Sequence, residues 1–178
     1  MVVVMVDSAT QPTQPPPASV TESPQATKPA GERQLVVFKL GDEEFGVDIM
    51  QVREIIRKTE ITRVPRAPDF VRGVINLRGQ ITTIINLRKK LGLPNKEGGD
   101  EHQERIIVVE MDGNVVGMEV DAVSEVIRLP ESDIEGVPPM MKNVRTQYLK
   151  GIGKLPERLL ILIDLKKVLN EDERSQLA

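Results

Sequence analysis

The sequence predicts a mainly β protein made of two small antiparallel barrels, and three observations support this fold class. The first is an internal repeat, the second is a series of strand-length apolar segments joined by tight turns, and the third is the absence of long amphipathic helices. The chain has 178 residues, which is enough for one domain or two small ones with a real core.

The repeat is visible by direct comparison of the chain with itself. Residues 36–56 align with 107–127 at an offset of 71, and residues 70–91 align with 148–169 at an offset of 78. Two copies of one unit, 36–91 and 107–169, therefore build the body, roughly one barrel per copy, with exchange of elements between the copies left open. The aligned pairs include Gly46 with Gly117, Val52 with Val123, Glu54 with Glu125, Gly73 with Gly151, and Asn86 with Asp164.

Strands are expected where apolar residues alternate or run continuously over strand length. Turn residues at 41–43 and 112–114 tolerate positive φ and predict that each copy opens with a hairpin. The predicted strands are 34–40, 44–49, 74–77, 81–86, 105–111, 114–120 and 159–164.

Helical segments are expected to be short. Asn86 can cap a helix over 87–91 that Gly92 ends, and Asp164 can cap a longer C-terminal helix that runs toward Asn170 or beyond. After the second strand of each copy, a short helix or turn is expected to bring apolar residues together. These residues are Val52, Ile55 and Ile56 in the first copy and Val123, Val126 and Ile127 in the second.

The ends and the middle of the chain have a different composition. Residues 1–33 are predicted to be a disordered tail, since the segment 7–33 carries six prolines among Ser, Thr, Gln and Ala. The folded domain is expected over 34–172, with a polar linker at 95–104 between the copies and a short tail at 173–178.

Composition disfavours several classes of function. The net charge of -3 and four aromatic residues argue against a nucleic-acid platform, which needs basic surface and stacking rings. The absence of cysteine excludes disulfides and thiolate metal sites and is compatible with the cytoplasm, the location we expect. The opening MVVVMVD lacks the features of a signal peptide, and no apolar stretch reaches membrane-spanning length, so direct membrane insertion is not expected.

No constellation of residues predicts catalysis. His102 is the only histidine and lies in the polar linker, so we expect no metal site and no cofactor. The carboxylates recur as repeat pairs, Glu54 with Glu125 and Asp48 with Glu119. Recurrence in both copies favours a shared structural role, such as pairing with Arg72 or Arg78, over an asymmetric acid/base couple.

Arg78 is the strongest candidate for a functional residue. Arg78-Gly79 in the first copy is replaced by Pro156-Glu157 in the second, so the fold common to both copies does not require arginine there. The alternative is a surface arginine in a turn that pairs with Glu54 or Asp48. Gly73 and Gly151 agree between the copies, which indicates a backbone or packing constraint.

A second asymmetry is the segment 137–141 (VPPMM), which the first copy lacks. Its two prolines exclude regular strand or helix and leave two methionines in a loop. One interpretation is an exposed contact surface, and the other is a loop folded back over the end of a barrel.

Four segments carry a family resemblance: LGDEEFGVDIMQVREI, FVRGVINLRGQITTIINLRKKLGL, VVGMEVDAVSEVI and YLKGIGKLPERLLILIDLKKVL. In order and spacing they resemble the chemotaxis coupling proteins of the CheW family over residues 34–172. Thr83 and Asn86 stand where members often have proline and aspartate. The resemblance implies two intertwined five-stranded, SH3-like barrels and a non-catalytic adaptor, recruited from the cytoplasm to membrane-associated receptor arrays.

The resemblance also implies partners and sites. The cytoplasmic tip of a methyl-accepting chemoreceptor would lie in an apolar groove, and the regulatory domain of a CheA-like histidine autokinase would pack on the first barrel. The implied receptor-binding residues are Ile49, Val52, Glu54, Gly73, Arg78 and Val123, and the implied kinase-binding residues are Ile81 and Met140.

Three other functions remain open from the sequence. One is an adaptor of the same fold in a paralogous array that controls pilus motility or development. Another is a nucleic-acid-binding barrel, and the third is an enzyme with a carboxylate site between the barrels.

Overall fold

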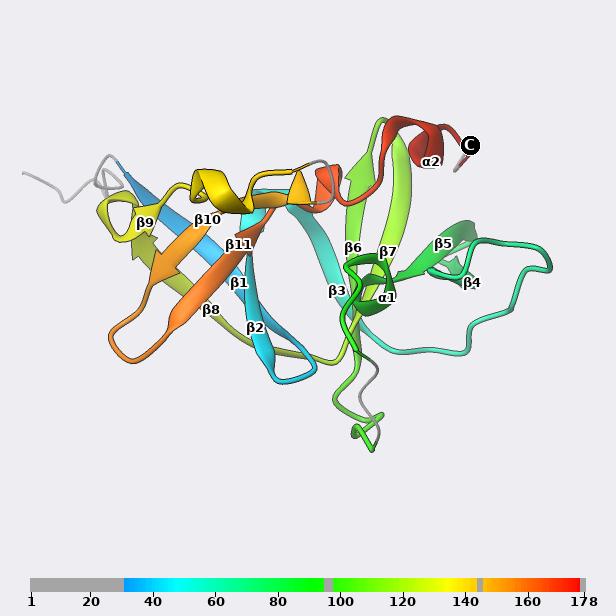
Figure 1. Cartoon of the computed structure of the whole chain (residues 1–178). Helices are drawn as coiled ribbons and strands as arrows, with labels where there is room; N and C mark the ends of the chain where they lie inside the picture. The colour runs from blue at the N-terminus through cyan, green and yellow to red at the C-terminus, as the bar shows by residue number, and fades with distance from the viewer. Residues whose placement is uncertain (1–30, 95–97, 144–145, 177–178) are drawn as a thin grey trace, which may run out of the picture. The chain divides into compact units, whose positions relative to one another are not determined.

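The structure is a computed structural model that describes residues 31–94, 98–143 and 146–176 (Figure 1). The strands are β1 (Glu32–Leu40), β2 (Glu43–Asp48), β3 (Val52–Arg57), β4 (Val71–Leu77), β5 (Gln80–Asn86), β6 (Arg105–Met111), β7 (Asn114–Val120), β8 (Ala122–Pro130), β9 (Ile134–Glu135), β10 (Leu149–Lys154) and β11 (Leu159–Ile163). The short helices are η1 (Ile49–Gln51), α1 (Leu87–Lys90), η2 (Glu131–Asp133), η3 (Pro139–Met141), η5 (Leu165–Lys167) and α2 (Glu171–Ser175).

The strands form two sheets that mix the two copies of the repeat. A six-stranded sheet has the order β8-β1-β2-β11-β10-β9, and a five-stranded sheet has the order β3-β6-β7-β5-β4. The hairpin β1-β2 of the first copy therefore pairs with β10 and β11 of the second, while β6-β7 of the second copy pairs with β4 and β5 of the first (Figure 1). The predicted mainly β fold is confirmed, and the barrels are intertwined.

The strand registers repeat in the two sheets. In the six-stranded sheet, β2 lies parallel to β11 with Gly46 opposite Leu162. In the five-stranded sheet, β7 lies parallel to β5 with Gly117 opposite Ile84. The offsets of 71 and 78 relate Gly46 to Gly117 and Ile84 to Leu162, so one pairing between copies occurs twice.

Glycine is required where these parallel strands cross. A Cβ on Gly46 would lie 2.8 Å from Leu160 Cδ2, and a Cβ on Gly117 would lie 2.5 Å from Ile84 Cδ1. Both distances are shorter than real carbon contacts, so a side chain at either position would displace buried neighbours. The agreement of Gly46 and Gly117 in the repeat thus reflects the close approach of the exchanged strands.

One aliphatic core joins the two sheets. Its buried residues come from strands of both sheets, for example Val47 and Ile163 from one and Ile85 and Met118 from the other. Two smaller buried clusters each consist of residues from one sheet. Leu35 and Leu162 belong to the cluster of the six-stranded sheet, and the five-stranded sheet has a cluster of its own. Phe38 and Phe45 stack with ring centroids 5.9 Å apart.

The predicted hairpins are confirmed. Leu40 pairs with Glu43 across Gly41 and Asp42, and Met111 pairs with Asn114 across two residues with positive φ, Asp112 and Gly113. The two helix caps are also confirmed. The Asn86 side chain accepts a hydrogen bond from Lys89 N at 3.1 Å, and the Asp164 side chain accepts one from Lys166 N at 3.0 Å.

Three predictions about elements are wrong. The segments expected to be helical or turn after each hairpin are strands, β3 and β8, because they pair with β6 and β1. The helix after Asp164 ends as η5, and a separate helix α2 begins after its cap at Asn170 and runs into the predicted tail at 173–178. β1 begins at Glu32, inside the predicted N-terminal tail, whose first 30 residues lie outside the described residues.

Other strands differ from the predictions in length or number. β4 begins at Val71 rather than at 74, and β9 and β10 were not predicted. β9 is the sixth strand of the sheet that contains β1, for which five strands were expected. Its counterpart in the five-stranded sheet is the isolated bridge between Thr62 and Val74, since Val74 is the repeat partner of Ile152, which pairs with Glu135 of β9.

Candidate functional site

Arg78 lies at the tip of the β4-β5 hairpin and forms a bidentate ion pair with Glu54 of β3. Its Nη2 lies 2.6 Å from Glu54 Oε2, and its Nη1 lies 3.1 Å from Oε1. β3 and β4 are the opposite edges of the five-stranded sheet. In a flat sheet these edges would be about 19 Å apart, at four strand spacings. The contact therefore shows that the sheet curls into a barrel, which this ion pair helps to close.

The turn that carries Arg78 has an unusual backbone. Arg78 has φ 52° and Gly79 has φ 87°, the positive values that a two-residue hairpin turn requires. The Asn76 side chain accepts a hydrogen bond from Gly79 N at 2.7 Å and fixes the turn. The Arg78 side chain remains 76% exposed although it is paired. The turn thus presents a cation to solvent in a fixed place, and the predicted alternative of pairing with Glu54 is confirmed.

The six-stranded barrel is closed by an ion pair that uses a different arginine. Glu125 of β8, the repeat partner of Glu54, pairs with Arg158 at 2.8 Å. Arg158 also lies 2.5 Å from Glu44, so one guanidinium joins two carboxylates. Arg158 aligns with Gln80, two residues after Arg78, and Pro156 occupies the position of Arg78. The two barrels are therefore closed by ion pairs at equivalent carboxylates and non-equivalent arginines.

The second pair of repeat carboxylates has two different roles. Glu119 is buried and lies 3.0 Å from Arg72 Nε. Asp48 instead caps η1 by accepting a hydrogen bond from Met50 N at 2.9 Å. The expected pairing of carboxylates with bases is confirmed for Glu54, Glu119 and Glu125 and is wrong for Asp48.

The apolar receptor-binding candidates lie against one core. Ile49 of η1, Val52 at the start of β3 and Val123 near the start of β8 are all half-buried and pack on the cluster that joins the two sheets. Each is anchored by the core on one side and reaches the surface on the other.

Sequence reasoning missed the exposed neighbours of these residues. Met50, between Ile49 and Val52, is 84% exposed, and Val126 on β8 is 50% exposed. Ile55, the repeat partner of Val126, is 37% exposed on β3. The apolar residues at 52, 55 and 56 have a spacing that suggests a helix or turn. In the strand that the structure shows, the side chain of Ile55 points outward.

The two kinase-binding candidates are both exposed and come from different sheets. Ile81 in β5 is 68% exposed, and Met140 in η3 is 98% exposed. Leu159, the repeat partner of Ile81, is 66% exposed at the start of β11. The sequence contained this signal, because position 81 aligns with position 159 across the repeat.

Gly73 has a structural role that its position predicts. It sits at a β-bulge in β4 with φ 146°, and a Cβ there would overlap the carbonyl oxygen of Thr62. A Cβ on Gly151, its repeat partner, would lie 2.6 Å from the carbonyl oxygen of Glu135. Both glycines allow a neighbouring segment to lie directly against the barrel.

The segment 137–141, expected to form a loop, ends in the short helix η3, since Pro139 is at the first helical position, and it borders an open cavity of about 700 Å³ on the six-stranded sheet. Val137 and Met141 line it together with Leu149, Ile152 and Leu159. Met141 is 43% exposed and Met140 is almost fully exposed, so the two interpretations of this loop both hold in part. One methionine borders the barrel, and the other faces solvent.

The described residues contain no cluster with the composition of a metal site. Among residues 31–94, 98–143 and 146–176, no group of three or more His, Asp or Glu side chains could hold a metal ion. His102 lies in the exposed loop before β6. In the same part of the chain, no helix has the length and apolar character needed to cross a membrane.

Comparison with known proteins gives a consistent result. The family model described as a CheW-like domain matches residues 34–173. The chain is 41% identical to the chemotaxis protein CheW of Klebsiella aerogenes over 83% of this chain and 89% of that protein. It is 38% identical to the chemotaxis protein CheW of Bacillus subtilis, over 80% of this chain and 89% of that protein.

Two further relatives extend this comparison. The crystal structure of the scaffolding protein TtCheW from Thermoanaerobacter tengcongensis has a TM-score of 0.71 and 38% identity, covering 79% of this chain and 90% of that one. Protein FrzA of Myxococcus xanthus is 29% identical over 68% of this chain and 74% of that protein.

Proposed function

This chain belongs to the CheW family, and from that premise we propose that it is a non-catalytic scaffold that couples transmembrane chemoreceptors to a histidine autokinase in chemotaxis. The partners follow from the family, whose named members are chemotaxis and scaffolding proteins. The protein would act in the cytoplasm, recruited to receptor arrays at the membrane.

The observation that carries this proposal is the arrangement around the Arg78–Glu54 ion pair. Glu54 lies on β3, whose first residue is Val52, and η1 with Ile49 directly precedes that strand. An amphipathic receptor helix needs apolar residues to pack on and a few fixed charges to orient it. Ile49 and Val52 supply the first and the exposed guanidinium of Arg78 the second. Val123, the repeat partner of Val52, would extend the apolar surface from β8.

The kinase would use other exposed apolar residues. The side chain of Ile81 is exposed on β5, three residues after Arg78 on the same β4-β5 hairpin. Met140 is exposed on η3, beyond the six-stranded sheet, and would make a second and weaker contact. An exposed apolar side chain that is not covered by its own chain favours a partner. Simultaneous binding of receptor and kinase would require the two partners to contact different sides of the β4-β5 hairpin, which carries both Arg78 and Ile81.

The mechanism is a local increase in concentration combined with differential binding. A scaffold that holds receptor and kinase together raises the concentration of each near the other without new contacts between them. Tethering alone does not switch a kinase. The adaptor must contact the active and inactive kinase arrangements unequally, because a ligand shifts a conformational equilibrium only through its differential affinity.

Co-sedimentation tests the proposal. Vesicles carrying a chemoreceptor cytoplasmic fragment are mixed with the histidine autokinase and with wild type, Val52→Glu or Arg78→Ala protein. We expect ternary recruitment by wild type and weaker recruitment by both variants. Val64→Glu is the matched control, because Val64 is 43% exposed and lies outside η1, β3 and β8. Wild-type protein that is folded and stays in the supernatant would refute the proposal.

A second function of the same class is an adaptor in a paralogous array for pilus motility or development. The similarity to protein FrzA favours keeping this candidate. To test this candidate, recruitment of the protein is compared for a receptor of the paralogous array and a flagellar chemotaxis receptor. Recruitment by the first and not by the second would assign the chain to the paralogous array.

A further inference from the structure

A basic cavity lies between the two short helices that follow the last strand of each repeat copy. Its volume is about 360 Å³, and α1 and η5 form two of its walls. It is distinct from the receptor surface and the kinase surface, because Ile49, Val52, Val123, Ile81 and Met140 do not line it. The lining residues are Lys89, Lys90, Leu91, Gly92, Gln147, Tyr148, Lys167, Val168 and Asn170.

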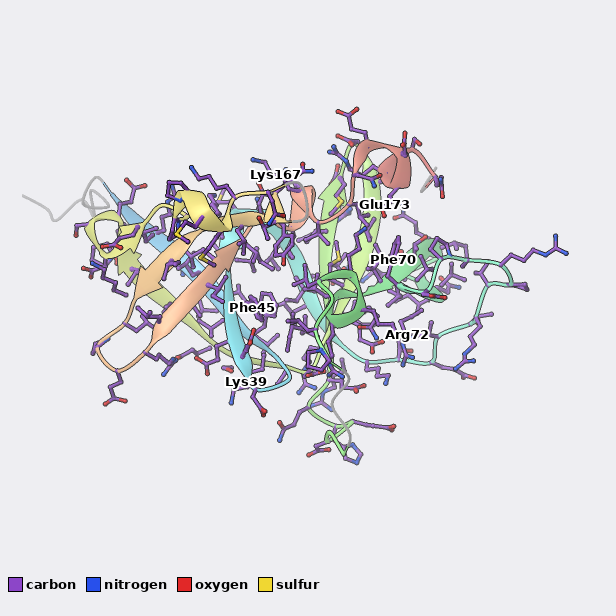
Figure 2. All side chains as sticks on the ribbon, in the orientation of Figure 1. Lys39, Phe45, Phe70, Arg72, Lys167 and Glu173 are labelled. Atoms are coloured by element: carbon purple, nitrogen blue, oxygen red, sulfur yellow. The ribbon has the colours of Figure 1, made fainter. Side chains whose placement is uncertain are left out.

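The repeat explains why cations converge there. Lys89 in α1 and Lys167 in η5 are repeat partners, each three residues after its helix cap, Asn86 or Asp164. Exchange of strands between the copies brings the two helices to one cavity. The same lysine position of the repeat therefore lines the cavity twice, once from each copy. Figure 2 labels Lys167 on η5, between β11 and α2.

The two lysines are available for a ligand. Within the described part of the chain, neither Lys89 nor Lys167 forms an ion pair, and both are exposed. The third lysine, Lys90, already has partners within the protein, because its Nζ lies 2.5 Å from Glu173 and 4.4 Å from the centre of the Phe70 ring. The chain as a whole is acidic, so this local excess of positive charge runs against its net charge of -3.

Neutral hydrogen-bonding groups complete the cavity. Gln147, Asn170 and the Tyr148 hydroxyl accompany the lysines, while Leu91 and Val168 add an apolar surface. Burial, and then the charge of Glu43, raise the pKa of Tyr148, which keeps its hydroxyl protonated and able to donate. The nearby carboxylate of Glu173 is neutralised by Lys90.

We propose that the cavity between α1 and η5 binds a small phosphate-bearing anion, held by the ammonium groups of Lys89 and Lys167. Lysine is a common phosphate ligand because it offers a compact charge with three donors. The volume lies at the lower end of the range for small-molecule sites, which suits a phosphate or a nucleotide-sized ester. Such a site would make the scaffold responsive to a metabolite or second messenger independently of its two protein partners.

Titration calorimetry on the full chain tests the proposal with inorganic pyrophosphate and with ATP as probes. Wild type should give saturable binding that weakens as salt rises. The double variant Lys89→Gln/Lys167→Gln should bind about tenfold more weakly or worse. The matched control is Lys142→Gln/Lys150→Gln, which removes the same charge outside the cavity and should bind like wild type. Equal affinities for the two probes would indicate recognition of phosphate alone, and tighter binding of ATP would show that its third phosphate or its nucleoside adds a contact.

Two results would overturn the inference. One is the absence of saturable binding to wild type up to about 10 mM of either probe, far weaker than a specific site provides. The other is equal affinity of wild type and the Lys89/Lys167 double variant, which would place the anion elsewhere. Both lysines are exposed, so the variant should fold, and an unchanged thermal midpoint without ligand checks this.

Discussion

The five-stranded and six-stranded barrels use the same strand pairing but are closed by different side chains. In the five-stranded barrel, Arg78 reaches Glu54 from a two-residue turn and remains 76% exposed. In the six-stranded barrel, Arg158 is 42% exposed and joins Glu125 to Glu44. The pairing of Arg158 with two carboxylates suits a structural role, whereas Arg78 keeps most of its surface available. The two copies thus differ at their closing arginines: the second is shared by two carboxylates, and the first is left largely exposed.

The barrels also differ in what covers them. In the five-stranded barrel, Leu169, Glu173 and Gln176, around α2, border a groove with Val71 and Val74 of β4. The corresponding strands of the six-stranded barrel, β10 and β11, line the open cavity of about 700 Å³ beside Met141. Figure 2 shows Glu173 on α2 and Phe70 at the start of β4. The helix that follows the second copy therefore borders the five-stranded barrel, and the six-stranded barrel has the more open cavity.

The largest expected effect comes from the paired glycines. Gly73→Ala should cost about 3 kcal/mol of unfolding free energy, because the alanine must adopt a positive φ and meets the carbonyl of Thr62. Gly151→Ala should cost less, about 1–2 kcal/mol, since Gly151 has no positive φ and its Cβ would meet the carbonyl oxygen of Glu135 at a longer distance. Urea denaturation of both variants measures the difference. A smaller cost at position 73 than at 151 would contradict the role assigned to the bulge.

Loss of the helix that covers the five-stranded barrel is expected to have the next largest effect. Glu173→Ala removes both the capping box with Asn170 and the ion pair with Lys90, which is partly buried, and should cost about 1–2 kcal/mol. Glu171→Ala on the same turn is the control and should cost a few tenths of a kcal/mol. Thermal midpoints of the two variants compare them, and equal midpoints would mean that α2 does not depend on these contacts.

The two closing arginines should differ modestly in stability. Arg158→Ala should cost about 1 kcal/mol because it leaves two carboxylates without their cation. Arg78→Ala should cost about 0.5 kcal/mol or less, since its ion pair is largely solvated. Urea denaturation of the two variants at low and high salt measures the loss of unfolding free energy for each. The prediction fails if removal of Arg78 destabilises the chain more than removal of Arg158.

The smallest effect concerns Tyr148, the only tyrosine of the chain. Burial raises its pKa above the ordinary value of 10.0, and the charge of Glu43 raises it further. Because the folded state holds the phenol proton more tightly, this contribution to stability is present below pH 10 and is lost as pH rises above it. Absorbance at alkaline pH should give a midpoint above 10 in the native protein. Glu43→Gln should lower that midpoint without restoring the ordinary value, since burial is the larger cause.

Local signals made much of the fold predictable. The turn residues at Gly41 and Gly113 identified the hairpins, and the caps at Asn86 and Asp164 identified the helix starts. The internal repeat identified the two barrels. The hairpins and the caps depend on residues close in sequence, where turn and cap chemistry decides the conformation.

The missed features depend on pairing between distant segments. β3 and β8 carry apolar residues with a spacing that suits a helix, and only their partners β6 and β1 make them strands. Arg78 was recognised because the two copies disagree there. The lysine cavity was not, because Lys89 and Lys167 meet only after the copies exchange strands, and nothing in the neighbouring sequence encodes that exchange.

Receptor-dependent autophosphorylation of the kinase, measured with Arg78→Ala and Arg158→Ala proteins in reconstituted arrays, tests the central claim most directly. Both variants remove one barrel-closing arginine, and both should stay folded. We predict that Arg78→Ala loses most receptor-dependent activation, while Arg158→Ala keeps it. Full activation with Arg78→Ala, or equal loss with both variants, would contradict the account that the closing arginine of the first copy binds a partner and that of the second only stabilises the fold.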